Sequence, residues 1–212
     1  MKGVLLEFAN AFGSTVPNVI AFQFNPETLR RTWTQPAPSP AGGNPLGVQG
    51  DPGEAYALTL MLDITDVLEG DENSPLVRDA AAAGLGSRIA ALEMLMFPVA
   101  SARPARGPSR STPTAQVPAV LFVWGPNRML PVRITALSIT ETLFDPLLNP
   151  THATVELGFR VLTPKELEKV TGPFKTIASA AYQAAQRKRE TLALFNLSTT
   201  AGSFNLPPIP GV

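Results

Sequence analysis

The chain has 212 residues, balances 17 Lys and Arg against 17 Asp and Glu, and holds 44% hydrophobic residues with no cysteine. Its length can bury one sizeable core, and the lack of cysteine excludes disulfides, thiolate metal sites and a cysteine nucleophile. The N-terminus lacks the apolar region of a signal peptide, and no apolar run approaches the roughly 20 residues that span a bilayer. We therefore expect a soluble chain made in the cytoplasm.

The charges sum to zero but are unevenly distributed along the chain. Residues 1–98 hold 5 basic and 11 acidic residues (5 − 11 = −6), and residues 99–212 hold 12 basic and 6 acidic residues (12 − 6 = +6). If the fold keeps the two halves apart, copies of the chain present opposite charges to one another. If it mixes them, this polarity is lost.

The first third of the chain alternates apolar and polar residues in short runs, which predicts strands over 3–8, 18–24 and 28–34. Asn25-Pro26 separates the last two, because proline cannot donate to a strand ladder. The next segment, 35–54, is rich in proline and glycine, which indicates a long loop or arm.

The middle of the chain predicts a strand over 55–65 and a helix over 88–97. The strand places alternate residues on one face, and the helix has an apolar stripe. These core positions are Tyr56, Leu58, Leu60, Leu62 and Ile64 in the strand, and Ile89, Leu92, Leu95 and Met96 in the helix. A second breaker-rich loop follows at 98–118, with Arg103, Arg106 and Arg110 and no acid.

The last part predicts three further strands and two helices. The strands are 119–125, covered on both faces; 130–144, with a bulge near 136–137; and 152–162. Thr163-Pro164 is typical of a helix start, and a longer helix is expected over 174–195. Its predicted apolar stripe is Phe174, Ile177, Ala178, Ala181, Tyr182 and Ala185.

Together these elements predict an α+β, β-rich fold whose mostly antiparallel strands close as a barrel or a two-sheet sandwich. A helix flanks the sheet in mid-chain and a helical segment ends the fold. The expected organisation is a tube-like β-barrel domain at 1–163, a helical segment at 164–197 and a proline-rich tail at 198–212.

Residues that carry chemistry are sparse. The only histidine, His152, opens a strand without an assignable triad or metal set, and "AAGLGSR" (82–88) is not a dinucleotide fingerprint. The acidic stretch 62–73 could bind calcium or pair Asp63 with Asp66 for hydrolysis, but it lacks the EF-hand ligand order. We predict no enzyme, no catalytic, cofactor or metal residues, and no nucleic-acid or membrane partner.

Three stretches resemble the tube-domain proteins of contractile injection systems, which are phage-tail-like particles. They are "FQFNPETLRR" (22–31), "LTLMLDITD" (58–66) and "ITALSITETLFDPLLNPTHATVELGFRVL" (134–162). The residues that carry the resemblance are Phe22, Phe24, Asn25 and Pro26; Leu60, Leu62, Asp63, Thr65 and Asp66; and Ile139, Glu141, Phe144, Leu148, Asn149, Pro150 and Ala153.

The resemblance implies a β-barrel-like tube fold that assembles as a hexameric ring of the inner tube at the baseplate. As a tube initiator, this ring would template tube polymerisation above the spike, in a particle assembled in the cytoplasm. The implied partners are five further copies, adjacent tube rings, and spike and baseplate proteins. The candidate interface residues are Asn25, Pro26, Arg30, Arg31, Asp63, Asp66, Arg103, Arg106, Arg110, Glu141, Asn149 and Pro150.

Two alternatives stay open. The chain lacks the LysM-like C-terminal module of some relatives, so a cap-end adaptor or an ordinary tube layer fits the same motifs. A stand-alone binding domain for a peptide or a polyanion fits the composition without the resemblance.

Overall fold

The strands of this protein form one antiparallel sheet. A computed structural model describes residues 1–8, 17–36, 46–48, 50–65, 74–98, 116–170 and 172–200. The strands are β1 (Val4–Phe8), β2 (Asn18–Ala21), β3 (Leu29–Thr34), β4 (Gly53–Asp63), β5 (Ala119–Val123), β6 (Met129–Phe144) and β7 (Pro150–Val161). Their order in the seven-stranded sheet is β2-β1-β5-β6-β7-β4-β3.

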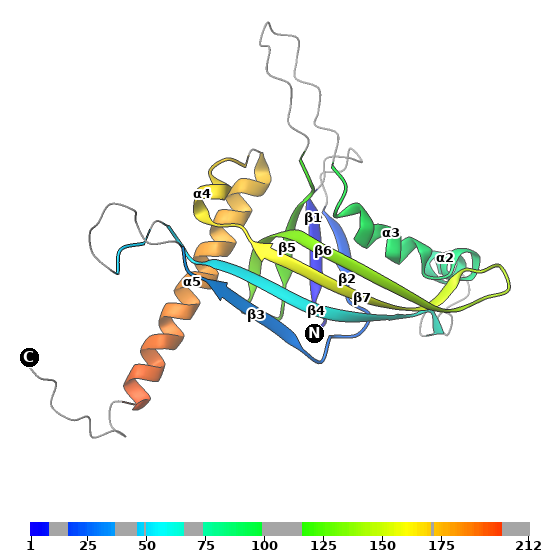
Figure 1. The fold of residues 1–212 in the computed structure, drawn as a ribbon, viewed down its shortest axis with the longest axis horizontal. Helices are drawn as coiled ribbons and strands as arrows, with labels where there is room; N and C mark the ends of the chain where they lie inside the picture. Colours follow the sequence, from blue (N-terminus) through cyan, green and yellow to red (C-terminus); the bar gives the residue numbers. More distant parts are fainter. Residues whose placement is uncertain are drawn as a thin grey trace, which may run out of the picture.

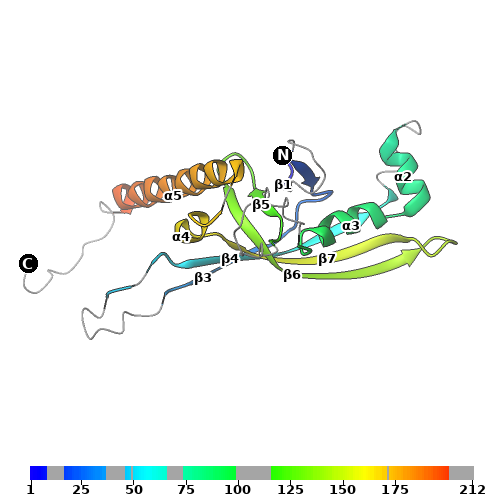
Figure 2. The same cartoon turned by 90° about the horizontal axis from the view of Figure 1, so that it is seen from above.

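Four helices accompany this sheet in the described part of the chain: α2 (Pro75–Ala83), α3 (Gly86–Met94), α4 (Pro164–Leu167) and α5 (Pro173–Thr200). Figures 1 and 2 show α2 and α3 near one end of the long strands and α4 and α5 near the other. The mostly antiparallel, β-rich α+β architecture is therefore confirmed. The sheet is not a closed barrel, because its end strands, β2 and β3, do not pair with each other.

The sheet is strongly curled, and aromatic rings fill the hollow. Phe122 of β5 lies with its ring centroid 4.7 Å from that of Phe159 in β7 and 5.8 Å from that of Tyr56 in β4. In the sheet, β5 and β4 are separated by β6 and β7, so these contacts require the sheet to fold over itself. Such buried ring pairs contribute about 0.5–1.5 kcal/mol each beyond the area they bury.

The helices complete two apolar clusters. Ile89, Leu92 and Leu95 close the main cluster over the core face of β4 and β7. On the other side of β5, Leu121 packs with Phe174, Ala178 and Ala181 of α5 in a second cluster. The strand at 119–125 is thus covered on both faces, as its continuous apolar run predicts.

Most local predictions are confirmed. The alternating core positions of β4 and β7 are buried, and the register of β6 shifts between Ile134 and Ala136, one residue before the predicted bulge. Thr163 and Glu166 form a capping box at the start of α4. Such a box satisfies N–H groups that a helix start leaves without partners.

Other predictions are wrong in detail. The second strand ends at Ala21 and not at residue 24, because Asn25 bonds to the start of β1 and draws the chain away from the sheet. The mid-chain helix ends at Met94 and not at residue 97, so Met96 lies in the turn after it and is 38% exposed. Ile177 of α5, predicted as a core position, is 42% exposed. Helix α2 is missed altogether, because the acidic and turn-forming residues before it dominate the local pattern.

Candidate functional site

The candidate site is a wide sheet surface and not a cleft with reactive groups. Strands β3, β4, β7 and β6 turn one face to the core and helices, and no element of the described chain covers the other, which we call the open face (Figure 2). From the strand register, its main residues are Arg30, Thr32, Ala55, Ala57, Thr59, Met61, Ser138, Thr140, Thr154, Glu156, Gly158 and Arg160.

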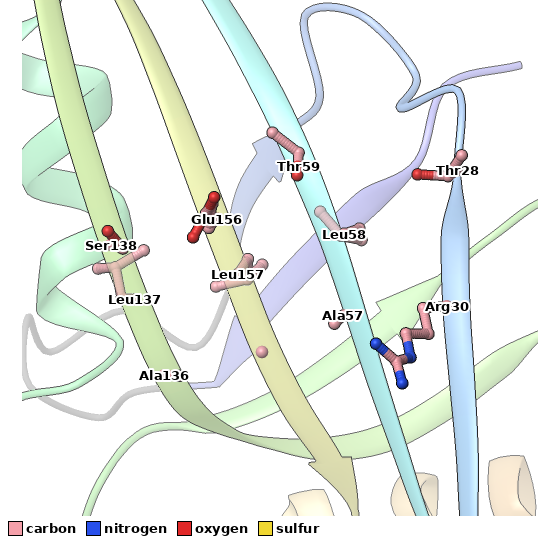
Figure 3. A pocket seen from close by; sticks show the side chains of 11 residues that line it. Thr28, Arg30, Ala57, Leu58, Thr59, Ala136, Leu137, Ser138, Glu156 and Leu157 are labelled. Atoms are coloured by element: carbon pink, nitrogen blue, oxygen red, sulfur yellow. The ribbon is translucent and has the colours of Figure 1, made fainter.

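The open face is made chiefly of short side chains. A shallow groove of about 410 Å³ crosses it between Arg30 on β3 and Ser138 on β6 (Figure 3). Its floor includes Gly158, where an added Cβ would lie 3.3 Å from the Cβ of Ala136. The two backbones approach closely here, next to the bulge in β6, and the face stays shallow as a result.

Strands β6, β7, β4 and β3 lie side by side and form a four-stranded unit. Each of its two outer strands, β3 and β6, has backbone that pairs on one side only. Strand β3 ends the sheet, so its outer side has no strand neighbour among the described residues; we call it the β3 edge. Strand β6 pairs with β5 only over Met129–Val132 but continues beside β7 to Phe144. The outer side of Arg133–Phe144, the β6 edge, has no strand neighbour in the described ranges.

A hydrogen-bonded group that includes the only histidine fastens the end of β4 to β7. The Nε2 atom of His152 lies 3.0 Å from a carboxylate oxygen of Asp63. Hydrogen bonds from the Thr65 backbone N–H and hydroxyl, followed by the charge of His152, lower the pKa of Asp63. The Thr151 hydroxyl donates to the Leu143 carbonyl at 2.8 Å, so it cannot also donate to the imidazole Nδ1 atom 3.2 Å away. The arrangement therefore fastens two strands and provides no activated nucleophile.

The end of β6 and the turn that leads to β7, residues 143–149, form an apolar tip, which we call the hairpin tip. Leu147 and Leu148 are each 78% exposed. The Asp145 carboxylate accepts hydrogen bonds from the backbone N–H groups of Leu147 and Asn149 and from the Asn149 side chain, all at 2.8 Å. Leu143 and Leu148 have φ values of 54° and 64°, a left-handed conformation that costs roughly 1–2 kcal/mol per residue.

The α2–α3 junction holds the base of the hairpin tip. The Leu85 N–H donates to the Pro150 carbonyl at 2.9 Å. Gly84 has a φ of 60°, and a Cβ built there would lie 2.5 Å from the same carbonyl oxygen. A side chain at this position would thus meet both backbone strain and a direct clash.

At the opposite end of the long strands, an ion pair attaches α5 to the sheet. Arg189 pairs with Glu54, whose side chain is 3% exposed, and the Tyr56 hydroxyl donates to the same carboxylate at 2.6 Å. Burial, followed by the neighbouring Glu54, raises the pKa of Tyr56. The Arg189 guanidinium also lies 4.8 Å from the Trp33 ring centroid.

The predicted interface residues occupy different surroundings. Arg30 and Asp63 lie on the open face, whereas Arg31 lies on the opposite side of β3 and contacts Trp33. Exposed Glu141 pairs in register with Ala153, on the core side of the sheet. Asp66, Arg103, Arg106 and Arg110 lie outside the described residues.

The residues of the two Asn-Pro pairs make contacts within their own chain. Asn25 accepts from the Gly3 N–H and donates to the Met1 carbonyl, and Asn149 completes the network in the hairpin tip. Pro26 lines a second groove on the open face, and Pro150 begins β7. These contacts give the conspicuous Asn-Pro motifs a role in folding, and a contact to a neighbouring copy remains a prediction.

Sequence reasoning missed the hairpin tip and the Glu54–Arg189 pair. The tip had a visible signal, because "LFDPLLNP" sets four large apolar residues among turn formers between two long strands. The ion pair had none, since its members are 135 residues apart.

No protein-family model matches the chain, and no curated protein matches it. Within the described ranges, no three His, Cys, Asp or Glu side chains are grouped so that they could hold a metal ion. In the same part of the chain, no helix combines the length and apolarity needed to cross a membrane.

Proposed function

We propose that this protein is a structural component of a contractile injection system and forms a hexameric ring of its inner tube. The observation that carries the proposal is the four-stranded unit with an open face and two open edges. Such edges are templates for pairing with another chain, and proteins usually protect them. If the β3 edge of one copy pairs with the β6 edge of the next, the free backbone N–H and C=O groups of both edges gain hydrogen-bond partners.

This contact joins two different surfaces, so repeating it closes a ring when the rotation between copies is right. Six copies would contribute 6 × 4 = 24 strands. Barrels with 16–18 strands already leave a water-filled channel, so a ring of this size would enclose a wide lumen. The open face would line it, which agrees with its short hydroxyl and methyl side chains.

Within the particle, the resemblance favours a baseplate ring that starts the tube above the spike. A ring in that place needs one end for the spike and the other for the first tube layer. The long strands of this chain separate two chemically different ends, the hairpin tip and the α4–α5 end (Figure 1). The cap-end adaptor and the ordinary tube layer remain the alternative positions.

A pair of proline substitutions tests the edge contact. Along an edge strand, successive N–H groups alternate between the neighbouring strand and the outside. Arg31→Pro and Thr32→Pro therefore differ in which N–H group they remove. The variant whose missing N–H group faces β4 loses a hydrogen bond within the sheet, and its fold is destabilised. The variant whose missing N–H group points away from the sheet is expected to stay folded but no longer to form the ring.

Native mass measurement and negative-stain microscopy give the readout, with circular dichroism to check folding. The wild-type chain is expected to form rings of six copies with a central hole. A folded monomer at every concentration would contradict the proposal and favour a stand-alone binding domain. Rings that survive both proline variants would leave the hexamer standing but exclude the β3 edge from its interface.

A further inference from the structure

An apolar groove lies where the curled sheet does not close. It runs between the end strand β2, the core face of β4 and the helix α3, has a volume of about 300 Å³, and we call it the α3 groove. Its floor is made of core side chains, those of Phe22, Leu60, Leu62 and Leu92, which are 2–7% exposed. Ligand sites are typically concave and mostly apolar, with volumes of roughly 300–1,000 Å³. The α3 groove is at the lower end of that range and suits a small ligand.

A single cation stands at the side of this groove. Among the described residues that line it, Arg88 in the first turn of α3 is the only charged one, and Asn18 and Ser87 are the other polar ones. The Nη1 atom of Arg88 donates to the side-chain oxygen of Gln23 at 3.0 Å. No ion pair within the described ranges involves Arg88. A guanidinium has five N–H donors, so the bond to Gln23 leaves further donors for a ligand.

A buried amide holds this arginine in place. Gln23 is 7% exposed, and its side-chain nitrogen donates to the Asp63 carbonyl at 2.6 Å. Its side-chain oxygen accepts from the Asp63 N–H at 3.0 Å as well as from Arg88. Because both ends of the amide are bonded to the end of β4, the guanidinium has a fixed support beside the groove. Such preorganisation lowers the entropy cost of binding a ligand.

The carboxylates around the α3 groove have other partners. Glu7 is 4% exposed and accepts a hydrogen bond from the side-chain nitrogen of Asn18 at 2.9 Å. The Asp63 carboxylate lies 3.0 Å from the Nε2 atom of His152. An anionic ligand would therefore meet an arginine whose charge is not balanced by an ion pair with these groups. The apolar floor and the cation beside it together select a ligand that has both an apolar part and a negative charge.

We propose that the α3 groove binds a small aliphatic carboxylate. The alkyl chain lies on the apolar floor, and the carboxylate accepts charge-assisted hydrogen bonds from Arg88. One guanidinium matches the single charge of a carboxylate, and its planar fork fits the two carboxylate oxygens. A neutral alcohol of the same length gains only the apolar contact, and an amine of that length is repelled by the arginine. This site goes beyond the proposed ring and does not depend on it.

Titration calorimetry of the full chain with octanoate, octanol and octylamine tests the ligand class. Octanoate is expected to bind at least about tenfold more tightly than the other two, because a hydrogen bond to a charged group is stronger than one between neutral groups. A second measurement locates the site. An eight-carbon carboxylate with a diazirine near the end of its chain is photolysed with the protein, and the labelled peptides are identified by mass spectrometry. Labelling is expected within 18–22 and 87–92, and excess octanoate should suppress it.

Two variants separate the charge from the apolar contact, with circular dichroism to check folding. Arg88→Gln should weaken octanoate binding at least about tenfold and leave octanol binding unchanged. Ala91→Phe fills the groove from α3 and should weaken the binding of both. Arg187→Gln, at an exposed position on α5, is the matched control and should change neither.

Four results would overturn the inference. They are no octanoate binding at millimolar concentration, octanol or octylamine binding as tightly as octanoate, an octanoate affinity that Arg88→Gln leaves unchanged, and labelling outside the α3 groove. Octanoate binding that weakens as the protein concentration rises and copies associate would show that a second copy covers the groove, and would also overturn it. If Arg88→Gln does not fold, the ligand series, the labelled peptides and Ala91→Phe decide the question. Each of these results is independent of whether rings form.

Discussion

The ion pair between Glu54 and Arg189 gives the sharpest test of how the C-terminal helix is attached. Replacing Arg189 with Met keeps much of the aliphatic stem but removes the charge. The Glu54 carboxylate is 3% exposed, and Tyr56 then remains as its hydrogen-bond donor. Breaking a buried pair in this way costs about 3–5 kcal/mol. The Arg189 side chain is 27% exposed, so water can enter, and we expect the lower end of this range, about 3 kcal/mol.

The loss is measured as the change in the free energy of unfolding by urea denaturation, with α5 followed by circular dichroism. Adding Glu54→Gln to Arg189→Met removes the uncompensated charge, so the double variant should recover to within about 1–1.5 kcal/mol of the natural chain. Arg187→Met, at an exposed position on the same helix, is the control and should change stability by less than about 0.5 kcal/mol. A similarly small effect of Arg189→Met would refute the role of this pair.

The other predictions concern the hairpin tip and its base. Gly84→Ala should destabilise the protein by more than about 2 kcal/mol, because it adds a clash with the Pro150 carbonyl to left-handed strain; Gly125→Ala, with a φ of 68° and open space around it, should cost only about 1 kcal/mol in the same denaturation experiment. Asp145→Ala should speed amide hydrogen exchange in the tip while β4 and β7 stay protected; unchanged exchange would mean that the carboxylate does not order the loop. Hydrogen bonds hold the pKa of Asp145 and of Asp63 below the usual carboxyl range. The ionised carboxylates should therefore stabilise the fold fully above about pH 4, the pKa of an unfolded aspartate, and this stabilisation should be lost as the pH falls through the lowered pKa values of the folded state. Amide exchange in the hairpin tip that is as slow at pH 2 as at pH 6, after correction for intrinsic rates, would contradict this.

The sequence predicts those elements whose pattern follows directly from local geometry. The strict alternation from Tyr56 to Ile64 and from Ala153 to Val161 matches the side-chain period of a strand, and burial follows it residue by residue. The continuous apolar run at 119–125 becomes a strand between two clusters. These segments needed no long-range information, because each pattern reports on its own faces.

What the sequence does not reveal depends on distant parts of the chain. Closure of a barrel depends on whether two end strands meet, and nothing in β2 or β3 alone shows that they stay apart. The pairing of Glu54 with Arg189 depends on where α5 is placed by the sheet. Of the candidate interface residues, Asn25 and Asn149 bond within their own chain. A sequence motif alone does not show which partner a side chain will find.

The curl that brings β5 over β4 has a consequence for how this chain reaches its native state. Leu5 pairs with Phe122 and Leu58 with Leu157, so contacts span 122 − 5 = 117 and 157 − 58 = 99 positions. The β6–β7 hairpin can form within about 1–10 μs, but non-local pairings of this kind make folding slow. At about 5–20 residues per second on the ribosome, β1 waits roughly 6–23 s for its partner β5 to be made. During that time the unpaired N-terminal strands are exposed to aggregation, and their protection influences the yield of folded protein.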